Sequence, residues 1–72
     1  MGKATEAQIQ YLNELMDFIG SRQNGYTLEK HGDLQHETEQ LKLHEAECDE
    51  TVMQKRIDAL RDKVENIFGK PN

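Results

Sequence analysis

The sequence is poor in residues that build large cores or covalent cross-links. Its 72 residues include one cysteine, one proline, no tryptophan and only two tyrosines and two phenylalanines. A lone cysteine excludes an intrachain disulfide and a four-thiolate zinc site, and it is typical of a reducing compartment. So few large apolar side chains allow a thin core, which contributes roughly 3–5 kcal/mol to folding. We therefore expect one small domain over residues 1–72, located in the cytoplasm.

Long apolar runs and an excess of basic charge are also missing. No stretch approaches the roughly 18 consecutive apolar residues of a membrane span. The chain has 14 acidic and 9 basic residues, a net charge of −5. A negative chain is repelled by phosphate backbones and by anionic lipid. The basic residues between 55 and 63 are interleaved with aspartates, so we expect no direct contact with nucleic acid and none with a membrane.

What the chain does have is a concentrated acidic segment, residues 33–50. Seven acidic residues and one lysine give it a net charge of −6, so the other 54 residues, with seven acidic and eight basic, sum to +1. The acidic residues are Asp33, Glu37, Glu39, Glu45, Glu47, Asp49 and Glu50. A dense negative segment is attracted to basic surfaces. The segment is therefore the first place to look for a partner.

The apolar residues are spaced as in helices, which predicts an all-α fold. The first predicted helix covers residues 6–19. Thr5 and Gln8 have the capping-box spacing at its start, and Gly20 can end it. Its apolar stripe, at steps of three and four residues, consists of Ile9, Leu12, Met16 and Ile19. This helix is the best-marked element of the sequence.

Residues 20–32 are predicted to be a linker. Three glycines interrupt them, and the pair Asn24-Gly25 is a strong turn signal. A hairpin around this turn is the weaker alternative, because the flanking residues lack apolar alternation. We expect Tyr26 and Leu28 to fold back and cover one end of the helices.

Residues 34–68 have a helical pattern whose apolar face changes near the middle. The first stripe consists of Leu34, Leu41, Cys48 and Val52. The second stripe, rotated by roughly 120° at 100° per residue, consists of Met53, Ile57, Leu60, Val64 and Ile67. Because residues 51–54 repeat the capping-box form, we predict two helices, about 34–49 and 52–68, followed by a tail over 69–72. One long helix that offers two faces to different neighbours is the alternative.

The stripes also predict how the helices pack. The first and last predicted helices both use alternating steps of three and four residues, which is the seam of coiled-coil-like packing. We expect these two helices to pack on each other, with the acidic segment bridging them. The result would be two to three helices in a small helical hairpin or an open three-helix arrangement.

The side chains best suited to chemistry are His36, His44 and Cys48. His44 and Cys48 are one helical turn apart, a spacing that can hold a metal ion. His36 is about two turns from His44 and cannot reach the same ion. No glycine-rich loop that could form an oxyanion hole accompanies His44 and Cys48. Paired catalytic carboxylates need a concave pocket, and a thin helical protein is not expected to form one. We expect no catalytic residue, no cofactor and no bound metal. The protein is therefore predicted not to be an enzyme.

These observations favour a small acidic regulator or inhibitor that docks on a basic or grooved surface of a larger protein, such as a nucleic-acid-handling machine. The carboxylates would supply long-range attraction and the leucines short-range contact. The candidate partner-binding residues are Leu34, Glu37, Glu39, Leu41, Leu43, Glu45, Glu47, Asp49 and Glu50. A self-assembling helical adaptor or chaperone-like protein, and hence a homo-oligomer, is the first alternative. A metal-responsive module through His44 and Cys48 is the second.

Overall fold

The computed structural model describes residues 3–70, and within them the chain is helical and contains no strand. The elements are α1 (Glu6–Gly20), α2 (Gly25–His31), α3 (Leu34–Leu43), the short 3₁₀ turn η1 (Glu45–Glu47) and α4 (Glu50–Phe68). The all-α class is confirmed. The described chain has four α-helices rather than two to three, because residues 20–32 contain α2.

The additional helix α2 forms because the turn signal at its start also caps a helix. The Thr27 amide donates to the Asn24 side chain at 3.0 Å, and the Asn24 amide donates to the Thr27 hydroxyl at 2.8 Å, a second reciprocal capping box. Gly32, at φ 82°, ends the helix. The helix buries none of its residues: Tyr26 is 66% exposed and Leu28 is 41% exposed. The prediction that these two side chains cover the end of the bundle is therefore wrong.

The predicted break between the second and third long helices is confirmed, and it comes earlier than predicted. Helix α3 ends at Leu43, and after η1 the backbone is extended at Cys48. The side chain of Asp49 then accepts a 2.8 Å hydrogen bond from the Val52 amide. Asp49, rather than Thr51, is thus the N-cap of α4. The alternative of one continuous helix is wrong.

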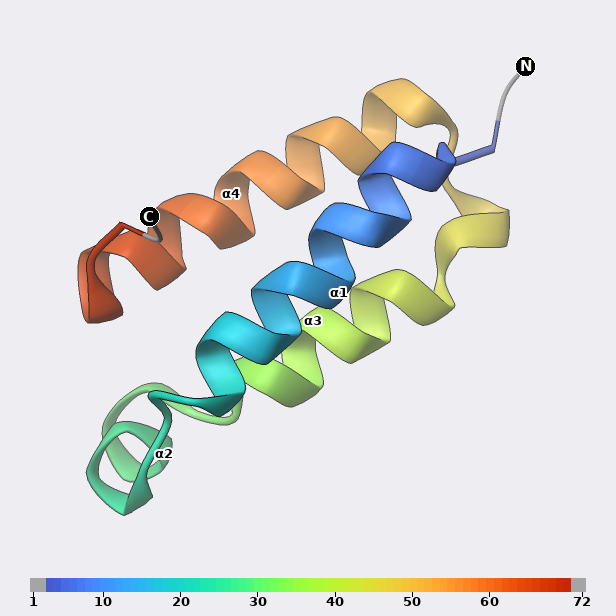
Figure 1. The fold of residues 1–72 in the computed structure, drawn as a ribbon. Helices are drawn as coiled ribbons and strands as arrows, with labels where there is room; N and C mark the ends of the chain where they lie inside the picture. The colour runs from blue at the N-terminus through green and yellow to red at the C-terminus, as the bar shows by residue number, and fades with distance from the viewer. Residues whose placement is uncertain (1–2, 71–72) are drawn as a thin grey trace.

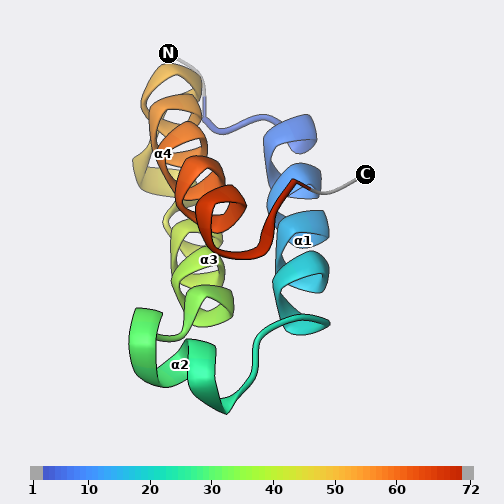
Figure 2. The same cartoon turned by 90° about the vertical axis from the view of Figure 1, so that its left-hand side faces the viewer.

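The three long helices lie side by side, as Figure 1 shows. Helices α1 and α4 run in the same direction, and α3 runs in the opposite direction. Figure 2 shows α1 to one side of the pair formed by α3 and α4, with α2 at the end of the bundle where α1 ends. This places η1 at the other end of the bundle, beside the starts of α1 and α4.

The core lies between the three long helices in two neighbouring clusters. One cluster consists of Leu15, Ile19, Leu34, Leu60 and Val64. The other consists of Leu12, Cys48, Met53 and Ile57. Each cluster joins residues of α1 to residues of α4, so these helices do pack on each other as predicted. The coiled-coil-like detail of that packing stays a prediction.

Buried polar groups are satisfied inside this core. The Gln8 side-chain amide donates to the Glu50 carbonyl at 3.0 Å and to the Gln54 side chain at 3.1 Å, which ties the start of α1 to the start of α4. The buried Thr38 hydroxyl donates to the Leu34 carbonyl at 2.8 Å. No buried side-chain nitrogen or oxygen between residues 3 and 70 lacks a partner.

The helices of the described chain are too short or too polar to cross a lipid bilayer. Helix α4 ends at Phe68 and is capped by Gly69, which has φ 89°. Lys70 follows outside the helix. Residues 71–72 of the predicted tail lie outside the described residues.

Candidate protein-binding surface

The turn between α3 and α4 gathers four of the predicted carboxylates. We call this surface the acidic junction and define it by Glu45, Glu47, Asp49 and Glu50. All four side chains are exposed. Residues 45–50 include no lysine or arginine, and η1 is a tight turn, so the four charges are confined to a short length of backbone.

Little of this negative charge is compensated within the chain. The Glu47 carboxylate lies 3.1 Å from Nδ1 of His44, which carries charge only when protonated. Asp49 accepts the amide hydrogen bond that caps α4. In the part of the chain that the structure describes, no lysine or arginine forms an ion pair with any of the four carboxylates. The junction therefore presents unneutralised charge to its surroundings.

The buried side chain of Cys48 anchors the acidic junction to the core. Cys48 is 4% exposed and packs in the core cluster with Leu12, Met53 and Ile57. A small, weakly polar thiol is suited to such a site. The carboxylates on either side of Cys48 remain exposed while the backbone between them is fixed to the core.

Two further predicted residues lie on the outer face of α3. Glu39 and Leu43 are one turn apart and point away from the side that buries Leu34 and Thr38. Leu43 is 65% exposed and directly precedes the turn to the acidic junction. The Glu39 carboxylate lies 4.0 Å from Nδ1 of His36. Leu43 is thus an accessible apolar residue beside the junction, and it is more exposed than Val52, at 40%, on the other side.

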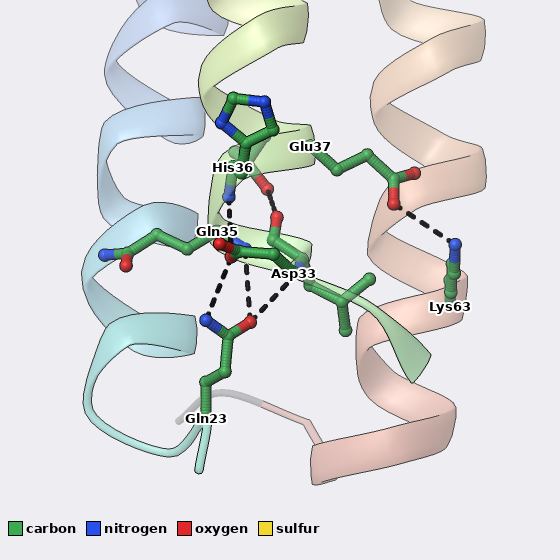
Figure 3. Close-up of polar contacts among 8 residues, drawn as sticks. Gln23, Asp33, Gln35, His36, Glu37 and Lys63 are labelled. Atoms are coloured by element: carbon green, nitrogen blue, oxygen red, sulfur yellow. Dashed lines mark hydrogen bonds and ion pairs between the residues drawn. The ribbon is translucent and has the colours of Figure 1, made fainter. Parts of the chain in front are cut away.

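The remaining predicted residues are not part of this surface. Leu34 is 1% exposed and lies in the core, so a partner cannot reach it without unfolding α3, and its role as a docking anchor is a wrong prediction. Leu41 is half-buried and packs against both core clusters. Glu37 points toward α4, where its carboxylate lies 3.2 Å from the ammonium group of Lys63 (Figure 3).

Asp33, at the start of the acidic segment, serves the fold. Its carboxylate accepts hydrogen bonds from the His36 amide and from the Gln23 side chain, both at 3.0 Å (Figure 3). These bonds, first of all the one from the His36 amide, lower the pKa of Asp33 below its usual value. The Gln23 side-chain oxygen in turn accepts from the Leu34 amide at 2.9 Å and, more weakly, from the Gln35 amide at 3.4 Å.

One acidic residue beside the junction was missed at the level of the sequence. Glu6, in the first turn of α1, lines the same shallow hollow of about 420 Å³ as Glu45. The two residues are close because α1 and α4 run in the same direction and begin at the same end of the bundle. Nothing in the local pattern around Glu6 signals this, since it depends on helix direction.

The other predicted chemistry gains no support from the geometry. Cys48 is buried, whereas His44 is exposed and directs Nδ1 to Glu47. Among residues 3–70 no three histidine, cysteine, aspartate or glutamate side chains come together in a way that could hold a metal ion. No observation therefore favours the metal-responsive alternative.

No protein-family model, curated protein or solved structure matches this chain. The inference of function consequently rests on the geometry and charge of the surface itself.

Proposed function

We propose that the protein is a non-catalytic regulator or inhibitor, acting in the cytoplasm, that places the acidic junction against a basic surface of a larger protein. The observation that supports this most directly is the exposure of Glu45, Glu47, Asp49 and Glu50 without an ion pair to any described lysine or arginine. Charge that no lysine or arginine of the described chain neutralises is available to a partner.

The junction and Leu43 would contribute differently to binding. Exposed carboxylates act over about 8 Å at physiological ionic strength, so they attract and orient a basic surface before contact. Leu43 would then supply apolar contact at short range, with Glu39 one turn away on the same face. Surfaces that handle nucleic acid are basic, which makes them candidate targets.

The test compares two variants that carry the same change in charge. The triple variant Glu45→Gln, Glu47→Gln and Glu50→Gln neutralises the junction and keeps Asp49, because Asp49 caps α4. The control, with three other glutamates replaced by glutamine, carries Glu14→Gln, Glu29→Gln and Glu65→Gln. Each tagged chain is used to capture proteins from the native cytoplasm at low and at high salt.

We expect the wild-type chain and the control to capture the same partner at low salt, and the junction variant to lose it. Raising the salt should release the partner from the wild-type chain, because exposed charges are screened. Equal capture by the two triple variants, or capture that salt does not weaken, would contradict the proposal. Circular dichroism of both variants checks that the helices are intact.

A further inference from the structure

The seam between α3 and α4 is covered by α1 on one side only (Figure 2). A groove of about 350 Å³ lies along this seam, lined by Glu37, Leu41, Arg56, Ala59, Leu60 and Lys63. Its volume is at the lower end of the range for ligand-binding clefts. Leu60 belongs to the core and Leu41 packs against it, so the apolar part of the groove is a continuation of the core.

The groove lining carries two basic residues and one acidic residue, a net charge of +1, whereas the acidic junction carries −4. Arg56 and Lys63 are on the α4 side, and Glu37 is on the α3 side. Glu37 and Lys63 form an ion pair across the groove at 3.2 Å. Arg56 is exposed and forms no ion pair with a carboxylate of the described chain. The α4 edge of this recess is thus basic in an otherwise acidic protein.

We propose that this groove binds an amphipathic helix of a partner protein, whose apolar side chains enter it and whose acidic side chains face Arg56 and Lys63. These two residues are seven positions apart, about 10 Å along α4, so carboxylates two turns apart on a bound helix would match them. Docking of an amphipathic helix in an apolar groove is a recurrent mode of peptide recognition. The bound helix would complete a four-helix arrangement in which it lies opposite α1.

A second copy of the chain is a poorer occupant. Two grooves facing each other would bring together two linings that each carry a net charge of +1, and like net charges oppose such a pairing. The proposal is also independent of the acidic junction, because the partner helix is acidic where the junction calls for a basic surface. Either proposal can fail without the other.

The test uses the full isotope-labelled chain and a synthetic amphipathic helical peptide. The peptide has leucines on one face and glutamates seven residues apart along the edge of that face. We expect its addition to shift the amide resonances of Leu41, Arg56, Ala59 and Leu60. Shifts confined to the acidic junction, or none at millimolar peptide, would overturn the proposal. Groove shifts that depend on protein concentration without peptide would show that a second copy binds there.

Two variants separate the groove from general electrostatics. Ala59→Glu places a carboxylate between Arg56 and Lys63 at an exposed helical position, so the fold is retained while peptide binding should weaken at least about tenfold. Gln10→Glu makes the same charge change on an exposed position of α1 and should leave peptide binding unchanged. Equal weakening by both variants would overturn the assignment to the groove.

A charge swap tests the specific contact to Arg56. A peptide with lysines in place of the glutamates should bind the wild-type groove about tenfold more weakly, and Arg56→Glu should restore its binding. The readout is confined to groove resonances, because a basic peptide also meets the acidic junction. Absence of this rescue would contradict the proposed orientation of the helix.

Discussion

The two ends of the bundle reverse the chain by different means. At one end, residues 21–33 are held by hydrogen bonds: Gln23 bridges to Asp33 and to the first amides of α3. At the other end, the turn through η1 is anchored by the buried Cys48, and the exposed carboxylates around it make few contacts. One acidic segment therefore contributes a helix cap at each end, Asp33 and Asp49, and it gathers exposed carboxylates without a described lysine or arginine partner around η1.

The difference between the two ends of the bundle explains why the number of charged residues in a segment does not by itself identify a binding surface. Asp33 and Glu37 add to the negative charge of the segment, yet both are engaged by the fold, in a helix cap and in an ion pair to Lys63. The carboxylates of the segment that neither cap a helix nor pair with a described lysine or arginine include those of Glu45, Glu47 and Glu50 in the acidic junction, to which α1 adds Glu6.

The largest expected effect separates a leucine of the core from a leucine of the docking surface. Leu34→Ala should lower the free energy of unfolding by about 2–5 kcal/mol, because it leaves a cavity among buried side chains. Leu43→Ala, at an exposed site next to the junction, should change it by no more than about 0.5 kcal/mol and weaken partner binding instead. Urea titrations of the two variants measure both values. Similar losses of stability in the two variants would contradict the assignment of Leu34 to the core and of Leu43 to the docking surface.

The next effect concerns the glycine that ends α2. Gly32 has φ 82° and ψ 179°, a region that is almost exclusive to glycine, so Gly32→Ala should destabilise the fold by about 1–3 kcal/mol. Gly25→Ala is the matched control, because Gly25 is helical and an added Cβ there meets open space. It should change stability by about 0.5 kcal/mol or less. Thermal unfolding of both variants measures the two changes in stability. Equal melting temperatures would contradict the role of Gly32 in ending α2.

A smaller effect is expected from the hydrogen bonds of Gln23. Gln23→Ala removes the acceptor of the Leu34 amide and should cost about 1–1.5 kcal/mol. At the opposite end of the bundle, Glu47→Gln should stay within about 0.5 kcal/mol of the wild-type chain, because its side chain is exposed. Chemical denaturation measures both variants. If Glu47→Gln proved the more destabilising, the contrast between the two ends would not hold.

The smallest effect is a dependence of stability on pH that comes from Asp33. Hydrogen bonds from the His36 amide and from Gln23 lower the pKa of Asp33 in the folded protein below its usual value of 3.8. The ionised group therefore stabilises the fold above that value, and the contribution is lost as the pH falls through the lowered pKa. The melting temperature of the wild-type chain should fall more than that of Asp33→Asn between pH 6 and pH 3. A constant difference between the two would contradict this linkage.

The long helices were predictable because their signals are local and periodic. The capping box of Thr5 and Gln8 forms as predicted, with hydrogen bonds of 3.1 and 3.0 Å. The change of apolar face within residues 34–68 correctly indicated a break. Helix α2 was missed because glycine and an Asn-Gly pair are turn signals, whereas here Asn24 caps a helix that buries none of its residues.

The candidate surface was only partly predictable, because exposure depends on packing between helices. The nine predicted residues include the four of the junction and the exposed Leu43, but also Leu34, which the core buries. The pairing of Glu37 with Lys63 across the groove joins residues 26 positions apart. Helical spacing groups Leu34 with Leu41 in one stripe, but it does not say which of the two the core buries completely, and it does not reveal the pairing of Glu37 with Lys63.

The most direct test of the acidic junction is zero-length carbodiimide cross-linking of the complex with the captured partner, followed by mass spectrometry. This chemistry joins a carboxylate to a lysine only where the two are in contact. We expect cross-links from Glu45, Glu47 or Glu50 to lysines of the partner, which the junction triple variant abolishes. Cross-links that arise only from carboxylates elsewhere, such as Glu29 on α2, would contradict the assignment of the acidic junction as the docking surface.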